Sequence, residues 1–330
     1  MNEHLIKVVD LKKYFPIKLG FVQSLLSKKS IFVRAVDGVS FEIGKQEIYG
    51  LVGESGCGKT TTGRCILQLE RPTAGKVYYK DIELSALTDE KLRKIRKDIQ
   101  IIFQDPYESL NPRMSVYDIL AEPLNLQNIT EDPEETEKKV AEALEEMGLV
   151  PPEEFLYRFP HELSGGQRQR VAIARAFILE PKFIVADEPV SMLDASIRAE
   201  VTKLILHMVE RLHCGFLYIT HDIALAAYIS NTIGVMYLGK LVETGTTKSV
   251  IKNPYHPYTQ ALINAVPVPD PTVKRGEIVI TGEVPSPVNP PSGCRFHPRC
   301  PYAMDICKKE EPETIEVEKG HKVACHLMTK

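Results

Sequence analysis

The sequence lacks the marks of several protein classes. It has no run of 18 apolar residues, so no segment is long and apolar enough to be a transmembrane helix. Its first four residues, Met-Asn-Glu-His, do not have the basic-then-apolar form of a secretory signal. The net charge is −3 with 26% charged residues, which is not the footprint of a nucleic-acid-binding protein. We therefore expect a cytoplasmic protein without a nucleic-acid partner, which would serve a membrane only through other subunits.

The chain of 330 residues suggests one large domain or two modest ones, and it has no internal repeat. Short apolar runs alternate with helical stretches, which predicts an α/β core. Segments of strand type lie near residues 5–11, 31–43, 47–52, 75–80, 98–103, 182–187, 215–220, 232–238 and 240–244. A helical insert is expected over roughly residues 106–180, and it includes an amphipathic helix over residues 134–147.

Residues 53–61 read Gly-Glu-Ser-Gly-Cys-Gly-Lys-Thr-Thr and fit the pattern G-x-x-x-x-G-K-[ST] without mismatch. A strand-type run precedes them and a helix is expected from Thr60 to Leu69, so their backbone N–H groups could point at the phosphates of a nucleotide. Lys59 would reach the β- and γ-phosphates, and the Thr60 hydroxyl would bind Mg²⁺. The predicted phosphate cradle consists of Glu54, Ser55, Gly56, Cys57, Gly58, Lys59, Thr60 and Thr61.

An acidic pair follows a second apolar strand over residues 183–187. Asp187 ends this strand and would hold Mg²⁺ through water. Glu188 comes next, where its carboxylate could polarise the attacking water as a general base.

A second helix N-terminus of the anion-binding type is predicted at residues 164–167, Ser-Gly-Gly-Gln. Ser164 is a good N-cap residue for the helix expected over residues 168–179, and Gly165 and Gly166 leave the first N–H groups exposed. Gln167 completes this segment.

In order and spacing, Lys59 in its loop, Leu163–Gln167 and the acidic pair resemble the ATPase subunits of ABC transporters. The resemblance implies a RecA-like α/β core with an antiparallel β element and an inserted helical subdomain. Gln104 resembles the Q-loop glutamine, which contacts Mg²⁺ and the attacking water. His221 resembles the switch histidine at the γ-phosphate, and residues 191–194 resemble the D-loop.

The residue that stacks on adenine in this family is aromatic, and Tyr14 resembles it. Phe15 and Phe32 are the alternatives.

The same resemblance implies a partner, because in this family the signature of one subunit closes over the ATP bound by another. Residues 163–167 would therefore complete a second chain's site, and this chain must pair with itself or with a similar subunit. The lengthened start over residues 12–36 resembles the second of the two ATPases of peptide importers, so a heterodimer is preferred over a homodimer. Two permeases and, indirectly, an extracytoplasmic solute-binding protein would complete a complex at the cytoplasmic face of the membrane.

The sequence of residues 105–114, directly after Gln104, resembles that of the dipeptide and oligopeptide importer ATPases in particular. Two prolines make this segment a loop, which in the family docks the membrane subunit. We therefore expect ATP-driven peptide import. Import of another solute, such as nickel or an opine, is an alternative, and an ABC ATPase without a transporter is a more distant one.

Residues 1–265 are expected to form the ATPase domain and residues 266–330 an extension rich in proline and poor in apolar residues. The extension carries Cys294, Cys300, Cys307 and Cys325. Such clustered cysteines in a reducing compartment argue for a metal staple that replaces the missing core. Residue types alone leave zinc and a [4Fe–4S] cluster open. The likeness of residues 293–301 to the tail of the peptide-importer ATPases implies the [4Fe–4S] cluster.

Cys57 lies among the predicted phosphate-binding N–H groups. An electropositive site of this kind should lower the pKa of its thiol. We therefore expect alkylating reagents to block ATP hydrolysis and bound ATP to protect.

Overall fold

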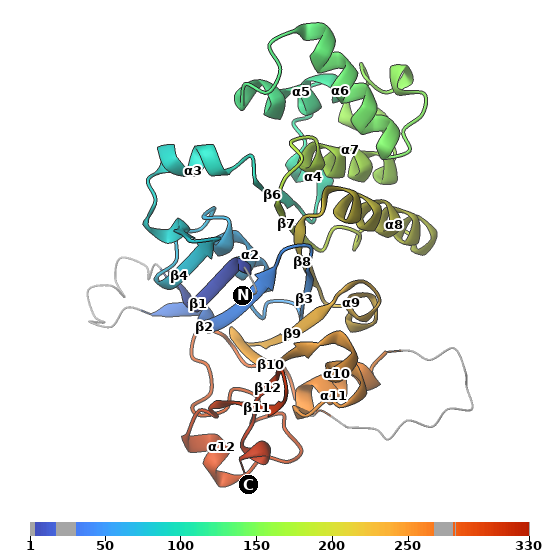
Figure 1. Ribbon diagram of the computed structural model, residues 1–330. Coiled ribbons are helices and arrows are strands. Elements are labelled where there is room, and N and C mark those ends of the chain that lie inside the picture. Colours follow the sequence, from blue (N-terminus) through green and yellow to red (C-terminus); the bar gives the residue numbers. More distant parts are fainter. Residues whose placement is uncertain (1–3, 18–30, 267–279, 281, 330) are drawn as a thin grey trace, which may run out of the picture. The chain divides into compact units, whose positions relative to one another are not determined.

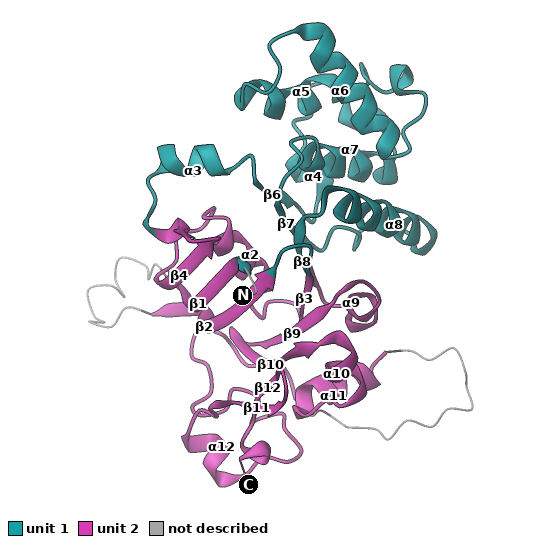
Figure 2. Ribbon diagram, viewed as in Figure 1, with its two compact units in different colours: residues 1–5, 44–47, 86–218 teal, residues 6–43, 48–85, 219–330 magenta. Residues whose placement is uncertain are grey.

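The computed structural model describes residues 4–17, 31–266, 280 and 282–329 of the chain. The connection over residues 18–30 and the prolines at positions 267, 269 and 271, on which parts of the sequence interpretation rest, lie outside the described residues. The chain divides into two compact units, which Figure 2 colours separately. The first comprises residues 1–5, 44–47 and 86–218, and the second comprises residues 6–43, 48–85 and 219–330.

The first unit contains parallel strands and several helices (Figure 2). Its strands β6 (Ile99–Ile102) and β7 (Phe183–Asp187) pair in parallel, and β8 (Gly215–Thr220), which begins in this unit, is the next neighbour of β7. All five residues of β7 are buried, as expected for a strand of a parallel sheet covered on both faces. The helices are α3 (Asp89–Ile95), α4 (Pro106–Ser109), α5 (Val116–Leu126), α6 (Pro133–Glu146), α7 (Gly165–Phe177) and α8 (Ala195–Leu212).

Local sequence signals set the ends of the helices in the insert. Ser115 and Asp118 form a capping box at the start of α5, with Asp118 N donating to Ser115 Oγ over 3.1 Å. Asp132 caps α6, whose first residue is Pro133. In Figure 1, helices α5, α6 and α7 pack together at the green end of the unit. Helices α4 to α7 thus fall within residues 106–180, where the sequence predicts a helical insert.

The second unit contains two sheets. In one, the strand order is β2-β1-β4-β5, built from β1 (His4–Pro16), β2 (Phe32–Gly44), β4 (Ala74–Tyr79) and β5 (Ile82–Glu83). In the other, the order is β11-β12-β10-β9-β3, built from β3 (Ile48–Val52), β9 (Thr232–Tyr237), β10 (Lys240–Thr246), β11 (Thr314–Glu318) and β12 (His321–Ala324). Strand β3 pairs in parallel with β9, and β4 pairs antiparallel with β1 and β5. This confirms the predicted α/β class and the antiparallel element.

Helices α2 (Lys59–Ile66), α9 (Ile223–Ile229), α10 (Thr247–Lys252), α11 (Pro257–Asn264) and α12 (Asp305–Lys309) complete the second unit. The turn between β9 and β10 consists of Leu238 and Gly239, both with positive φ, as the commonest tight hairpin turns require. Within the part of the chain that the structure describes, no helix is both long and apolar enough to cross a membrane.

The extension is not core-poor, which corrects the prediction. Strand β12 pairs with β10, so the extension continues a sheet whose strands β3, β9 and β10 precede residue 266. Phe296 is 1% exposed and packs among Tyr237, His256 and Tyr258, with ring centroids 5.2, 5.6 and 5.4 Å away. The sequence did not reveal this core because most of the partners of Phe296 lie on strands and helices before residue 266.

Candidate functional site

The phosphate loop has the predicted strand–loop–helix order, from β3 through residues 53–58 to α2. Gly58 precedes the helix with φ of 106°, and a Cβ there would lie 2.1 Å from the Ala35 carbonyl oxygen. A Cβ on Gly53 would lie 2.2 Å from the Met236 carbonyl oxygen. Both positions therefore require glycine for the backbone to follow this path.

Lys59 is directed into the loop and is 5% exposed. Its Nζ donates to the carbonyl oxygens of Gly53, over 2.7 Å, and Glu54, over 3.0 Å. Ser55 and Gly56, at the tip, are exposed. The loop thus has an ammonium group on its inner side and N–H groups at a helix start, which together suit an anionic ligand.

The expectation that the pKa of the Cys57 thiol is lowered is wrong. Burial raises the pKa of its thiol, and the neighbouring Lys59 ammonium, which acts in the opposite direction, does not outweigh it. The side chain is 3% exposed. Cys57 is therefore a packed neutral thiol and not an activated one.

In the first unit, β6 and β7 bring Gln104 and Glu188 together, with Gln104 Nε2 3.4 Å from Glu188 Oε2. Asp187, at the end of β7, is 4% exposed. Glu188 has φ of 46°, a left-handed conformation that a non-glycine residue seldom adopts and that is concentrated at functional sites. Ser191, from the predicted D-loop, stabilises this turn because its Oγ donates to the Glu188 carbonyl oxygen over 3.0 Å.

Residues 164–167 form the predicted cap of α7. Gln167 N donates to Ser164 Oγ over 3.3 Å, and Ser164 N donates to Gln167 Oε1 over 2.9 Å. This reciprocal pair is a capping box. A Cβ on Gly165 would meet no atom within 4 Å, so the space beside the first turn is open.

The segment after Gln104 is partly helical, since α4 forms one turn capped by Asp105. Tyr107, on that turn, is 61% exposed, and the Arg168 guanidinium of α7 lies 3.8 Å from its ring centroid. Arg175 of α7 donates to the Ser109 carbonyl oxygen over 2.8 Å. The predicted docking loop is therefore tied directly to the helix that residues 164–167 begin.

The remaining predicted residues lie in the second unit with the phosphate loop. His221 follows β8 and is exposed, and the next residue, Asp222, caps α9. Tyr14 lies on β1, half-buried, with the Arg34 guanidinium 5.8 Å from its ring centroid. Its hydroxyl donates to Asp37, and burial together with this bond raises the pKa of Tyr14 to about 12.

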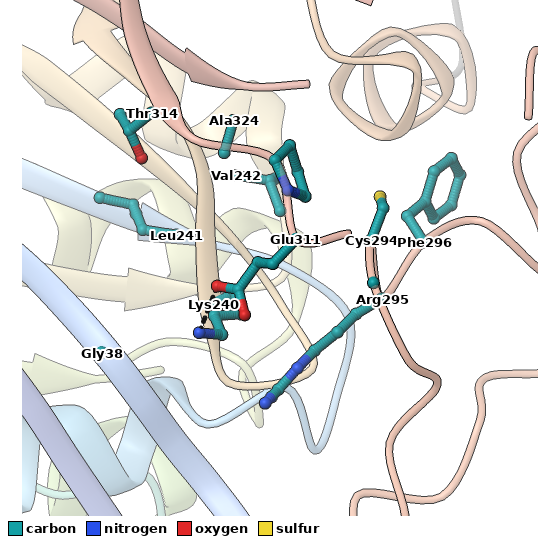
Figure 3. A pocket seen from close by; sticks show the side chains of 12 residues that line it. Gly38, Lys240, Leu241, Val242, Cys294, Arg295, Phe296, Glu311, Thr314 and Ala324 are labelled. Carbon is teal, nitrogen blue, oxygen red and sulfur yellow. Dashed lines mark ion pairs between the residues drawn. The ribbon is translucent and has the colours of Figure 1, made fainter. Parts of the chain in front are cut away.

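The structure does not support the predicted metal staple. Among the residues that it describes, which include all four cysteines of the extension, no three His, Cys, Asp or Glu side chains are grouped to hold a metal ion. Of the four, only Cys294 lines the pocket between β10 and the extension, where Lys240 and Glu311 form an ion pair (Figure 3). Burial raises the pKa of Cys294 and of Cys325 to about 11, and neighbouring cysteines of the extension raise both further. The extension shares a core with the rest of the second unit through Phe296, which packs on Tyr237 and Tyr258, so its own few apolar residues do not by themselves call for a staple.

Sequence reasoning missed four polar residues around the nucleotide-binding elements: Asp37, Tyr258, Arg295 and Arg299. Arg295 pairs with Asp37, and Arg299 pairs with Glu54 of the phosphate loop. Arg299 and Glu54 are 245 residues apart in the sequence, so no local pattern joins them. The only sequence feature that could have pointed to these contacts is the pair of arginines in residues 293–301. The prediction for that segment depends on its cysteines instead.

Comparison with known proteins agrees with this geometry. Residues 36–191 match the family described as ABC transporter, and residues 242–307 match the one described as oligopeptide/dipeptide transporter, C-terminal region. The chain is 50% identical to the oligopeptide transport ATP-binding protein AppF of Bacillus subtilis, over 99% of this chain and 98% of AppF. It is 44% identical to the dipeptide transport ATP-binding protein DppF of Haemophilus influenzae, over 98% and 97% of the two chains.

Among solved structures, the dimeric ATP-binding cassette MJ0796 bound to ADP and Pi aligns with a TM-score of 0.64 at 30% identity. It covers 73% of this chain and 98% of that one. The fold is thus that of an ABC ATPase cassette with mixed sheets. With two ATP-binding relatives matched over nearly their whole length, the chain belongs to the family of ATP-binding proteins of oligopeptide and dipeptide ABC transporters, and it is an ATPase coupled to transport.

Proposed function

We propose that this chain hydrolyses ATP to power the import of dipeptides or oligopeptides. The observation that carries the proposal is the 50% identity to an oligopeptide transport ATP-binding protein over nearly the full length of both chains. The match of residues 242–307 to the C-terminal region of peptide transporters adds to it, because this region lies beyond the cassette itself. Nickel or opine import is the second candidate, which the names of these relatives do not favour.

Each predicted site residue has a proposed role in ATP binding or hydrolysis. Lys59 and the N–H groups of residues 53–61 bind the phosphates, and Tyr14 stacks on adenine. Glu188 acts as the general base and is positioned by the amide of Gln104, and His221 contacts the γ-phosphate. Residues 164–167 complete the site of a partner ATPase.

Mg²⁺ would be held by the Thr60 hydroxyl, the Asp187 carboxylate and Gln104. These oxygen donors suit the ion, and Asp187 is a buried carboxylate at the end of β7. When bound, the ion would neutralise charge that develops on the phosphate oxygens.

We further propose a peripheral complex on the cytoplasmic face of the membrane, with a second ATPase and two permeases. The MJ0796 cassette is dimeric, which supports pairing of ATPases. The contacts from α4 to α7 support a mechanical role for the exposed Tyr107 turn, since a permease that pushed on this turn would move the start of α7. The division into an ATPase domain over residues 1–265 and an extension over 266–330 is part of this proposal.

The iron–sulfur cluster, with zinc as its alternative, stays a prediction from the sequence of the extension. Absorbance of anaerobically purified protein near 400 nm, with iron and zinc analysis, tests it, and a colourless, metal-free protein would contradict it.

Uptake in a strain that lacks the gene tests the peptide assignment. Labelled dipeptide uptake should be lost and should return with the wild-type gene but not with Lys59→Ala. Nickel uptake measured in parallel should stay unchanged. Normal dipeptide uptake in the deletion strain, together with lost nickel uptake, would replace this function by the second candidate.

A further inference from the structure

Glu54, which follows the first glycine of the phosphate loop, is bonded by two residues far along the chain, Tyr258 and Arg299. The two terminal nitrogens of Arg299, Nη1 and Nη2, donate to Glu54 Oε2 over 2.8 Å and to Oε1 over 3.1 Å. The Glu54 backbone N–H donates to the Tyr258 hydroxyl over 2.8 Å. Both the side chain and the backbone of this loop residue are thus fixed by the C-terminal part of the second unit.

The bracing residues are themselves rigidly placed. Tyr258 is fully buried, and its ring packs against Tyr237 and Phe296, with centroids 4.8 and 5.4 Å away. The side chain of Arg299 is 10% exposed, its Nη1 lies 3.4 Å from the Tyr237 hydroxyl, and its guanidinium lies 5.8 Å from the Tyr237 ring centroid. An arginine guanidinium is protonated at any physiological pH, so this group is charged beside Glu54.

A carboxylate on a phosphate loop repels the nucleotide that the loop must bind. A planar guanidinium that pairs with both carboxylate oxygens removes most of that repulsion and fixes the carboxylate in one orientation. Because the pair is sheltered from water on the Arg299 side, the neutralisation is stronger than at an exposed pair.

From this contact we infer that Arg299 is a positioning residue for ATP: it neutralises Glu54 at the phosphate loop, so that the C-terminal extension sets the ATP affinity of the ATPase core. The inference rests on the proposed role of residues 53–61 in phosphate binding. Glu54, Tyr258 and Arg299 all lie in the second unit.

The test is the Kd of the full-length chain for Mg·ATP, measured by isothermal titration calorimetry. Arg299→Ala should weaken binding roughly 10-fold, since it leaves the Glu54 charge uncompensated beside the phosphates. Glu54→Gln, which keeps the size of the side chain but removes its charge, should bind at least as tightly as the wild type. The double variant Glu54→Gln/Arg299→Ala should recover most of the lost affinity, and Arg299→Lys should lie between the wild type and Arg299→Ala.

Lys308→Ala is the matched control. This lysine also lies in the extension and forms an ion pair, with Asp305, but its side chain is 60% exposed. Its removal should leave the Kd within about twofold of the wild type, because an exposed pair contributes little. Added salt should reduce the Arg299→Ala defect, because screening weakens the repulsion.

Two results would overturn the inference. One is an Arg299→Ala chain with a wild-type Kd, and the other is a double variant as weak as Arg299→Ala alone, which would make Arg299 a purely structural brace. If Arg299→Ala did not fold, Glu54→Gln alone would decide, because weaker ATP binding by that variant contradicts the charge argument. Lys59→Ala separates this inference from the function beneath it, since normal ATP binding by Lys59→Ala would refute the phosphate-loop assignment itself.

Discussion

Replacement of Asp37 by alanine tests how the extension is joined to the ATPase core. Asp37 accepts from the Tyr14 hydroxyl and from Arg295, and the side chains of Asp37 and Arg295 are only 10% and 8% exposed. Asp37→Ala leaves Arg295 buried without this carboxylate, although its Nη1 still donates to the Leu238 carbonyl oxygen. Removing one partner of a buried pair costs about 3–5 kcal/mol. For a chain of 330 residues that corresponds to a fall in Tm of about 4–7 °C.

Differential scanning calorimetry of the full-length chain measures this fall. The control is Asp305→Ala, which also removes a carboxylate from an ion pair, with Lys308, but from a side chain that is 90% exposed. That variant should change Tm by less than about 1 °C. Equal shifts in the two variants would refute the reasoning, because the cost is attributed to burial of Arg295.

The pH dependence of the same variant has a defined sign. Burial alone would raise the pKa of the Asp37 carboxyl, but Tyr14, Lys240 and Arg295 outweigh burial and the net pKa lies below its ordinary value. The carboxylate therefore stabilises the fold fully above about pH 4, and this contribution is lost as the pH falls through the lowered pKa. The Tm difference between wild type and Asp37→Ala should shrink only in that acidic range.

Two further outcomes follow from the phosphate loop. Gly58→Ala should abolish ATP binding measured by calorimetry, because a Cβ would lie 2.1 Å from the Ala35 carbonyl oxygen at a φ of 106°, and retained binding would contradict the required backbone path. Cys57 should react with iodoacetamide more slowly than glutathione at pH 8 and faster as the pH rises, because burial raises the pKa of its thiol. Peptide mapping by mass spectrometry measures the rate, and rapid labelling at pH 7 would show the thiol to be activated.

Much of the site could be predicted from the sequence because its motifs are local. Residues 53–61 carry their chemistry in consecutive positions, and the cap formed by Ser164 and Gln167 needs only a spacing of three. The conformation of each motif depends on the backbone geometry of residues that are neighbours in the sequence. The same applies to the strand segments before residue 245, all of which the structure contains.

The extension could not be predicted in the same way. Its core residue Phe296 packs on Tyr237 and Tyr258, and strand β12 pairs with β10, so its stability comes from partners distant in sequence. The composition of the extension shows few apolar residues, and the metal staple was predicted as a substitute for a core. Composition does not include the apolar partners that lie elsewhere in the chain. For Cys57, the sequence showed the nearby Lys59 but not the burial that outweighs it.

The central claim is that two ATPase subunits close on ATP and that Glu188 activates water for its hydrolysis. Glu188→Gln, measured by multi-angle light scattering with Mg·ATP in the presence of the second ATPase subunit, tests it most directly. We expect a stable dimer that retains ATP, with turnover lowered at least about 100-fold because the general base is lost. Hydrolysis at the wild-type rate, or ATP retained only by a monomer, would contradict it.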